Sequence, residues 1–368
     1  MTEWPRAEAS AEFNLLHPSS SPVEADDAAD LMGRDPMLAP AGHPALVCPI
    51  TAAISSHCER AHAHSLRWAI EQGLVEPRER KFERLGEARF AYLAARCYPW
   101  VSADELDLAA DWIMFLFFYD DMCDRQAATD PDYLEKLIIR EDRLIAVAQS
   151  CGVEPGDTPL EHALADILAR FAARASDLWL RRIGAHVRQY IEGVRWERIL
   201  RAQSRVPSLA TYSRLRLLVS AVFPCFDFSA IYIDPRRTDF VSNVYVQQLE
   251  VMANNYICWV NDIYGLFKEI AEGTTSNLVI VLSHERKLGW NLALDQAIEM
   301  CNAELKAFFE LQEQLQLLGN PDCQAYVKAL AAWMRGNLDW YAETRRYKHN
   351  GPTGLAACWS EWTSWSAD

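Results

Sequence analysis

Apolar residues recur at three- and four-residue spacing along most of the chain after about residue 51. This spacing marks the buried face of an α-helix, and it predicts helices over 54–74 and 80–100. The same pattern predicts further helices at 102–121, about 131–150, 159–175, 177–203, 208–220, 240–272, 290–318 and 322–347. We find no alternating segment bounded by turn residues that would indicate a strand. The pattern therefore predicts an all-α fold, a single-domain helical bundle built around one or two buried helices.

The predicted helix at 102–121 is apolar on nearly all sides. Ser102 precedes Glu105 by three residues, which is the spacing of a capping box at a helix start. A helix that is apolar all round is expected to be central in the fold. Residues 1–45 are rich in Ser, Pro, Ala and Asp without a sustained apolar period. We therefore expect a disordered N-terminal tail over 1–45, a helical domain over 46–350 and a C-terminal tail over 351–368.

Composition narrows the class of protein. Of 368 residues, 50% are hydrophobic and 24% are charged, and no apolar run approaches the roughly 20 residues that cross a bilayer. The N-terminus lacks the basic and apolar regions of a signal peptide, so we expect a cytoplasmic protein without a stable membrane anchor. Ten cysteines occur singly, with no C-x-x-C pair. This usage favours buried, reduced thiols over a disulfide framework or a zinc site.

The formal charge of −15 argues against nucleic acid or an anionic membrane as a partner, because both bind to basic surfaces. An acidic protein that binds an anion must reverse its field locally, either with metal ions or with clustered Arg and Lys.

One acidic cluster lies at the end of the central helix. Asp120 and Asp124 are four residues apart and share a helix face, and Asp121 lies about 100° round from Asp120. Taken alone, this cluster could be a solvated helix end. Negative charge at a helix C-terminus is disfavoured by the macrodipole, however, so a positive group is expected to offset it.

A second polar stripe lies about 140 residues later, in the predicted helix 240–272. Asn261, Gly265 and Glu269 are spaced at i, i+4 and i+8, with Asp262 and Lys268 flanking the stripe. Carboxylate and amide oxygens suit a hard cation such as Mg²⁺, which leaves its remaining positions to water or phosphate. An ordinary surface helix is the alternative. It fits poorly, because the surrounding residues are mostly apolar and buried polar groups need partners.

The segments "DDMCD" at 120–124 and "NDIYGLFKE" at 261–269 resemble the paired metal-binding motifs of class I terpene synthases of the microbial type. The resemblance extends from about residue 45 to residue 350. It implies an all-α terpenoid synthase fold in which three Mg²⁺ ions hold an isoprenoid diphosphate between two facing helices. A homodimer is a further expectation from the family.

The resemblance also implies roles for the acidic residues. Asp120 matches the aspartate that bridges two metal ions, and Asp121 and Asp124 support it. Asn261 and Glu269 match ligands of the third ion.

One position departs from the family pattern. Gly265 stands where the family usually has Ser or Thr, and because glycine offers no oxygen we expect a water to take its place. Lys268 matches a contact to the diphosphate. Arg346 and Tyr347 match the family's "RY" pair, whose side chains bond the diphosphate.

Arg216 lies 45 residues before Asn261 and matches the arginine that senses the diphosphate. Ser220 then falls at the hinge of a broken helix. Arg214 is the competing candidate, and a surface salt bridge worth about 0–1 kcal/mol is the structural alternative for either arginine.

A carbocation needs walls that do not react with it and that stabilise positive charge through aromatic ring faces. Phe117 lies one helical turn before Asp120, and Phe90 or Tyr92 could line the same cavity. Trp340 matches a pocket tryptophan of the family. Packing in the core is the alternative for each of these rings.

The resemblance thus implies a terpene cyclase acting on farnesyl diphosphate, with geranylgeranyl diphosphate possible. Two alternatives stay open at this stage. One is a prenyl diphosphate synthase that elongates chains on the same fold, which would be expected to carry a second aspartate-rich motif. The other is a non-catalytic prenyl-binding protein, which the loss of an oxygen at Gly265 would favour.

Overall fold

The structure is a computed structural model that describes residues 44–124, 131–203, 205–271, 273–317 and 319–344. None of these residues forms a β-strand, so the prediction of an all-α fold is confirmed. The helices are α2 (Cys58–Glu71), α3 (Arg80–Ala88), α4 (Phe90–Cys97), α5 (Ala103–Asp124), α6 (Pro131–Ser150), α7 (Pro159–Ala172), α8 (Asp177–Ala202), α9 (Leu209–Val219), α10 (Val222–Ile231), η1 (Phe240–Ser242), α11 (Val244–Ala271), α12 (Leu278–Arg286), α13 (Trp290–Gln316) and α14 (Pro321–Glu343).

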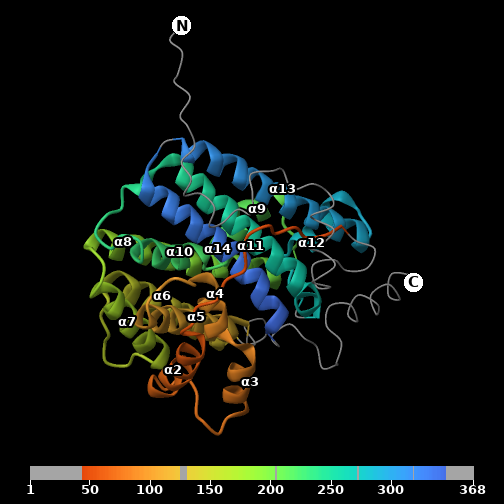
Figure 1. Cartoon of the computed structure of the whole chain (residues 1–368). Helices are drawn as coiled ribbons and strands as arrows, with labels where there is room; N and C mark the ends of the chain where they lie inside the picture. The colour runs from red at the N-terminus through yellow and green to blue at the C-terminus, as the bar shows by residue number, and fades with distance from the viewer. Residues whose placement is uncertain (1–43, 125–130, 204, 272, 318, 345–368) are drawn as a thin grey trace.

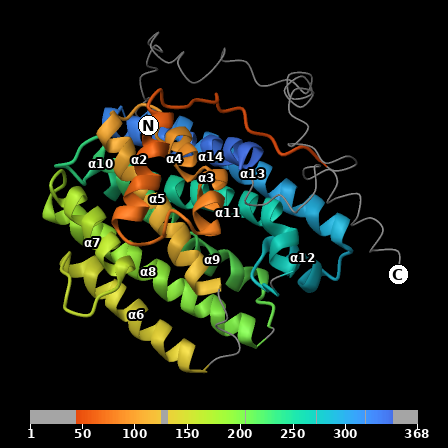
Figure 2. The ribbon, with the colours of Figure 1, turned by 90° about the horizontal axis from the view of Figure 1, so that it is seen from below.

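Helices α5 and α11 each pack against several other helices of the bundle. Every residue of α5 from 106 to 116 is buried, as its apolar character predicts, and Glu105 accepts a hydrogen bond from the backbone N–H of Ser102 at 2.8 Å. Helix α5 packs against α2, α4 and α7, while α11 packs against α9, α12, α13 and α14. In Figures 1 and 2, α13 and α14 (blue) lie beside α11, and α6 and α7 lie on the far side of the molecule.

The prediction of a single helix over 80–100 is wrong, because the helix is interrupted at Arg89. This residue has a left-handed φ of +55°, which ends α3 and starts α4. Trp340 Nε1 on α14 donates to the carbonyl oxygens of Ala88 at 3.2 Å and Arg89 at 3.1 Å. Thr344 Oγ1 donates to the same Ala88 oxygen at 2.9 Å. Distant side chains thus satisfy the carbonyls at the break, which local periodicity cannot reveal.

Two helices, α10 and α12, are absent from the sequence prediction. Helix α10 is buried nearly all round, so it shows no helical period. Helix α12 starts at Asn277, whose side chain accepts hydrogen bonds from the N–H groups of Val279 and Ile280. An asparagine before an apolar run is a start signal that could have identified α12.

No helix in the described ranges is long and apolar enough to cross a membrane. The nine cysteines within these ranges carry free thiols, and all except Cys151 are buried, as expected for reduced thiols in a core. The predicted tails lie almost wholly outside the described residues, so the domain boundaries stay predictions.

Helices α4 and α14 meet at Gly336. A Cβ on this residue would lie 2.6 Å from the carbonyl carbon and 2.7 Å from the carbonyl oxygen of Arg96. Backbone atoms cannot move aside as a side chain can, so this contact requires glycine.

We therefore expect Gly336→Ala to lower the free energy of unfolding by about 1–3 kcal/mol through overpacking. Gly86→Ala is the matched control, because no atom lies within 4 Å of the Cβ it would add in α3. It should be neutral or stabilise by up to about 1 kcal/mol, the difference in helix propensity. Urea unfolding of both variants provides the comparison. Equal stability would contradict the close approach of α4 and α14.

Candidate active site

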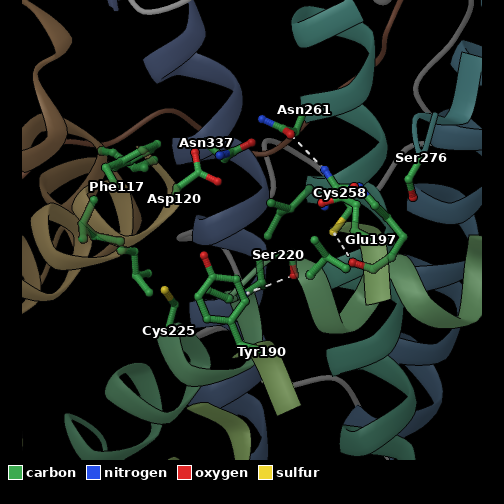
Figure 3. A pocket seen from close by; sticks show the side chains of 18 of the residues that line it. Phe117, Asp120, Tyr190, Glu197, Ser220, Cys225, Cys258, Asn261, Ser276 and Asn337 are labelled. Atoms are coloured by element: carbon green, nitrogen blue, oxygen red, sulfur yellow. Dashed lines mark hydrogen bonds between the residues drawn. The ribbon is translucent and has the colours of Figure 1, made fainter. Parts of the chain in front are cut away.

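A cavity of about 200 Å³ lies among α4, α5, α8, α9, α10, α11 and α14 (Figure 3). Its lining divides into apolar and polar groups. The apolar group includes Ile113, Phe117, Ile257, Trp333 and Trp340. The polar group includes Asp120, Glu197, Arg201, Arg216, Asn261 and Glu269. The same cavity therefore has both apolar walls and a set of charged and amide side chains.

Two of the four predicted aromatic residues line this cavity. Phe117 and Trp340 both face it, with ring centroids 5.7 Å apart. Phe90 does not line the cavity, and that prediction is wrong. Its ring stacks on Phe117 with centroids 3.9 Å apart and an interplanar angle of 14°. Phe90 therefore supports Phe117 from behind.

The prediction that Tyr92 lines the cavity is also wrong. Its hydroxyl donates to Glu59 at 2.6 Å, and the Arg89 guanidinium lies 4.7 Å from its ring centroid. Because α4 begins anew after the break at Arg89, Tyr92 turns toward α2 and the next residue, Leu93, lines the cavity.

The acidic cluster of α5 is a helix end, as predicted. Asp120 lines the cavity one turn after Phe117. Asp121 is half-buried and is not part of the lining. The backbone of Asp124 ends α5, but its side chain lies outside the described residues.

Asn261 and Asp262 on α11 meet Arg216 on α9. Arg216 donates to Asp262 Oδ1 through Nε at 2.9 Å and through Nη2 at 2.7 Å. The same Nη2 donates to Asn261 Oδ1 at 2.9 Å. Of the two candidate arginines, Arg216 is buried at the cavity, whereas Arg214 is exposed and donates to the carbonyl oxygen of Ala210.

Asp262 is fully buried, and its carboxylate accepts hydrogen bonds from residues of two other helices. Besides Arg216, its carboxylate accepts from the Tyr212 hydroxyl and from the backbone N–H of Leu278 at 2.7 Å. These bonds join α9, α11 and α12. Asp262 therefore points into the protein rather than into the cavity, and it fixes the position of Arg216.

The space left by Gly265 is filled by Glu269. A Cβ on Gly265 would lie 2.6 Å from Glu269 Oε1. The other carboxylate oxygen, Oε2, accepts from Asn277 Nδ2 at 2.9 Å. The carboxylate of Glu269 thus leans back over the glycine, and the expectation that a water takes the place of the missing side chain stays a prediction. The glycine thus gives Glu269 room to approach Asn261 along the stripe.

Helices α9 and α10 are separated by a short interruption at residues 220 and 221, where Ser220 was predicted as a hinge. Ala221 adopts a left-handed φ of +54°, a conformation that costs roughly 1–2 kcal/mol for a non-glycine residue. The Ser220 hydroxyl donates to Asn254 Oδ1 at 3.0 Å, and Asn254 Nδ2 donates to the carbonyl oxygen of Leu217 at 3.1 Å. Asn254, a buried residue of α11, therefore braces the break at the edge of the cavity.

Negative charge is crowded at the polar end of the cavity. Burial raises the pKa of Glu269 to about 8, and Asp262 adds to this effect, while Arg216 and the hydrogen bond from Asn277 oppose it. A carboxylate in such a place binds a proton or a cation readily.

Glu197 and Arg201 of α8 also line the cavity, and no motif in the sequence pointed to them. Burial raises the pKa of Glu197 to about 7, although Arg216 and Arg201 lower it. Arg201 donates to Thr274 Oγ1 at 3.2 Å. Their spacing of four residues on a long helix resembles an ordinary surface ion pair, so only the fold reveals their position.

Four predicted site residues cannot be placed. The side chains of Asp124 and Lys268 lie outside the described residues, although Lys268 belongs to α11. Arg346 and Tyr347 lie beyond residue 344, outside the described part of the chain. Their proposed contacts stay predictions.

The all-α bundle and its cavity, acidic at one end and aromatic at the other, define a class I terpenoid synthase. Residues 111–307, which include both acidic motifs, match the family described as "Terpene synthase family 2, C-terminal metal binding". The chain belongs to the terpene synthase family. The resemblance seen in the sequence is confirmed, as is the assignment to this class of enzyme.

Relatives of known activity match along most of the chain. It is 36% identical over 307 residues to (+)-T-muurolol synthase ((2E,6E)-farnesyl diphosphate cyclizing) of Roseiflexus castenholzii, covering 82% of this chain and 93% of the relative. It is 30% identical over 315 residues to germacrene A synthase of Nostoc punctiforme, covering 83% and 95%. The crystal structure of a-eudesmol synthase matches with a TM-score of 0.72 and 25% identity, over 80% of this chain and 98% of that chain.

The raised pKa of Glu269 predicts how stability depends on pH. A carboxyl whose pKa is higher in the folded than in the unfolded state binds extra protons when folded, so stability falls as pH rises between the two values. Glu269 ordinarily titrates near 4.5 and here near 8. Without metal, we expect wild type to lose stability relative to Glu269→Gln from pH 5 to pH 8.5.

Urea unfolding in the presence of a chelator at several pH values measures this difference. Glu313→Gln, which removes an exposed carboxylate of α13, is the control and should follow wild type. A constant difference between wild type and Glu269→Gln across the range would refute the electrostatic account.

Proposed function

We propose that the protein is a Mg²⁺-dependent terpene cyclase that ionises farnesyl diphosphate and cyclises the carbocation to a sesquiterpene hydrocarbon or alcohol. The main support for this proposal is that one cavity is lined by polar and by aromatic side chains. Asp120 of α5 and Asn261 of α11 supply the polar lining, and Phe117 and Trp340 supply the aromatic walls. A diphosphate and its prenyl chain need these two environments side by side.

The C15 substrate is favoured over geranylgeranyl diphosphate for two reasons. The cavity, about 200 Å³, lies below the range of roughly 300–1,000 Å³ found for ligand pockets, which favours the shorter chain. The (+)-T-muurolol synthase, a relative that covers most of this chain, is named for cyclising farnesyl diphosphate.

The donor set fits a divalent metal. Asp120, Asn261 and Glu269 offer carboxylate and amide oxygens to one cavity, and hard cations prefer such ligands. Within the described ranges, no three His, Cys, Asp or Glu side chains form a metal site alone. Mg²⁺ often binds through one or two carboxylates with water and substrate phosphate. We propose that these residues, with Asp121 and Asp124, hold three Mg²⁺ ions, which when bound supply Lewis-acid stabilisation of the leaving diphosphate.

Cationic side chains would hold the diphosphate as it leaves the allylic carbon. Arg216 is fixed beside Asn261 by its bonds to Asp262, so its charge is in place before the reaction and needs no reorganisation. Arg201 lines the same cavity from α8. By resemblance, Lys268, Arg346 and Tyr347 would complete the contacts.

The ring faces of Phe117 and Trp340 would stabilise the carbocation, because the face of an aromatic ring carries negative potential. Phe90 keeps the Phe117 ring in place by stacking on it. Ser220, at the helix break, would contact the substrate from the side of α9. The enclosing apolar walls exclude water from the cation. A homodimer and a cytoplasmic location stay predictions from the family and from composition.

Incubation with farnesyl or geranylgeranyl diphosphate and Mg²⁺, followed by gas chromatography of the products, tests this proposal. We expect a cyclic C15 product. Asp120→Ala, Asn261→Ala and Arg216→Ala should each lower its formation by at least about 100-fold, since each removes a group that stabilises developing charge. Arg214→Ala is the matched control on α9 and should stay within about twofold of wild type, as expected for a surface residue.

A longer prenyl diphosphate as product would instead identify a chain-elongating synthase. Absence of turnover would favour a non-catalytic prenyl-binding protein. Retained turnover in both Asp120→Ala and Asn261→Ala would rule out the metal assignment.

A further inference from the structure

Asn337 is a polar residue in the wall of the cavity, and neither the sequence motifs nor the proposed mechanism uses it. It lies on α14, between Trp333 one turn before it and Trp340 and Tyr341 one turn after it, and all four residues line the cavity. Figure 3 labels Asn337 among the residues around this space. Only 6% of Asn337 is exposed.

The carboxamide oxygen of Asn337 is buried and accepts no hydrogen bond in the described part of the chain. A buried acceptor left unsatisfied costs about 1–3 kcal/mol. Such a group calls for an explanation, and it lies where a substrate would lie. A binding partner within the cavity would account for it.

The depth of Asn337 follows from a hydrogen bond between α11 and α14. Asn261 Nδ2 donates to the Tyr341 hydroxyl at 2.6 Å, which places Tyr341 at the level of the proposed metal ligands. Asn337 lies four residues before Tyr341 on α14, about 6 Å away along the helix axis. Trp333 follows one turn beyond, where it packs against Tyr98 and Phe226 with ring centroids 5.3 and 6.2 Å away. Asn337 therefore lies within about one helical turn of the proposed metal ligands, and Figure 3 shows it at the same end of the cavity as Asp120 and Asn261.

We propose that the Asn337 carboxamide oxygen stabilises positive charge on the prenyl chain at this depth and thereby helps to select the product. The inference rests on the proposed cyclase function. The negative end of a carbonyl dipole, held rigid in an apolar cavity, stabilises a nearby cation more than it would in water. The neighbouring rings act on cations over a broad face, whereas one oxygen acts at one point. Asn337 thus favours cations centred near it over their isomers.

A pair of variants with similar shape isolates the oxygen. Asn337→Leu removes the dipole and keeps about the same size, while Asn337→Asp keeps an oxygen in the same place. Each variant is incubated with farnesyl diphosphate and Mg²⁺, and each product is expressed per diphosphate released. This partition does not depend on the overall rate, so a loss of folded enzyme alone would leave it unchanged.

For Asn337→Leu we expect the ratio of the main product to all other products to fall about tenfold or more, as for loss of one electrostatic contact. Asn337→Asp should stay closer to the wild-type ratio. If Asn337→Leu prevents folding, judged by circular dichroism, Asn337→Ala removes the same oxygen with a smaller side chain.

An unchanged product ratio in the variant that lacks the oxygen would overturn the proposal. So would an equal shift in Asn337→Leu and Asn337→Asp, which would assign the effect to shape. Wild-type enzyme that forms no cyclic product is a different result, because it contradicts the proposed function itself.

Discussion

The buried ion pair between Arg216 and Asp262 holds the polar end of the cavity together. Asp262 is fully buried, and taking two charges out of water costs several kcal/mol for each ion unless geometry and further hydrogen bonds compensate. Here the compensation comes from Tyr212 and from the backbone N–H of Leu278, in addition to two bonds from Arg216. The pair therefore joins α9, α11 and α12 and leaves Arg216 Nη2 beside Asn261.

This arrangement explains how a protein of net charge −15 can receive a polyanion. Burial raises the pKa of Glu269, and the negative charges of Asp262 and Glu197 raise it further. A divalent cation relieves such crowding more strongly than a proton does, and it reverses the sign of the field that an incoming diphosphate meets. The apolar walls of Phe117 and Trp340 then begin one turn away from the acids. Helix α5 thus carries both Asp120, which faces the proposed metal and diphosphate end, and Phe117, which faces the proposed site of the carbocation.

The helical class and the two acidic motifs could be predicted from sequence because each depends on local spacing. Asp120, Asn261 and Glu269 do line one cavity. The direction of the Tyr92 side chain could not be predicted, because it depends on the interruption of the helix at Arg89. That interruption is stabilised by Trp340 and Thr344, which lie about 250 residues away in the chain.

The flanking residue Asp262 likewise looked like part of a motif, but its partners come from two distant helices, α9 and α12. The effect of Gly265 could not be predicted either, since it depends on where the Glu269 side chain turns. Glu197, Arg201 and Asn337 carry no motif at all. Their role in the lining arises only from the packing of α8 and α14 around the cavity.

The central claim is that α5 and α11 together bind metal and diphosphate at the mouth of an apolar cavity. A crystal structure of the protein with Mn²⁺ and inorganic diphosphate tests it most directly, because anomalous scattering locates Mn²⁺ without ambiguity. The account predicts metal on Asp120 and also on Asn261 and Glu269, with the Glu269 carboxylate still over Gly265 and the diphosphate in contact with Arg216. Metal on only one of the two helices, or diphosphate bound away from Arg216, would contradict it.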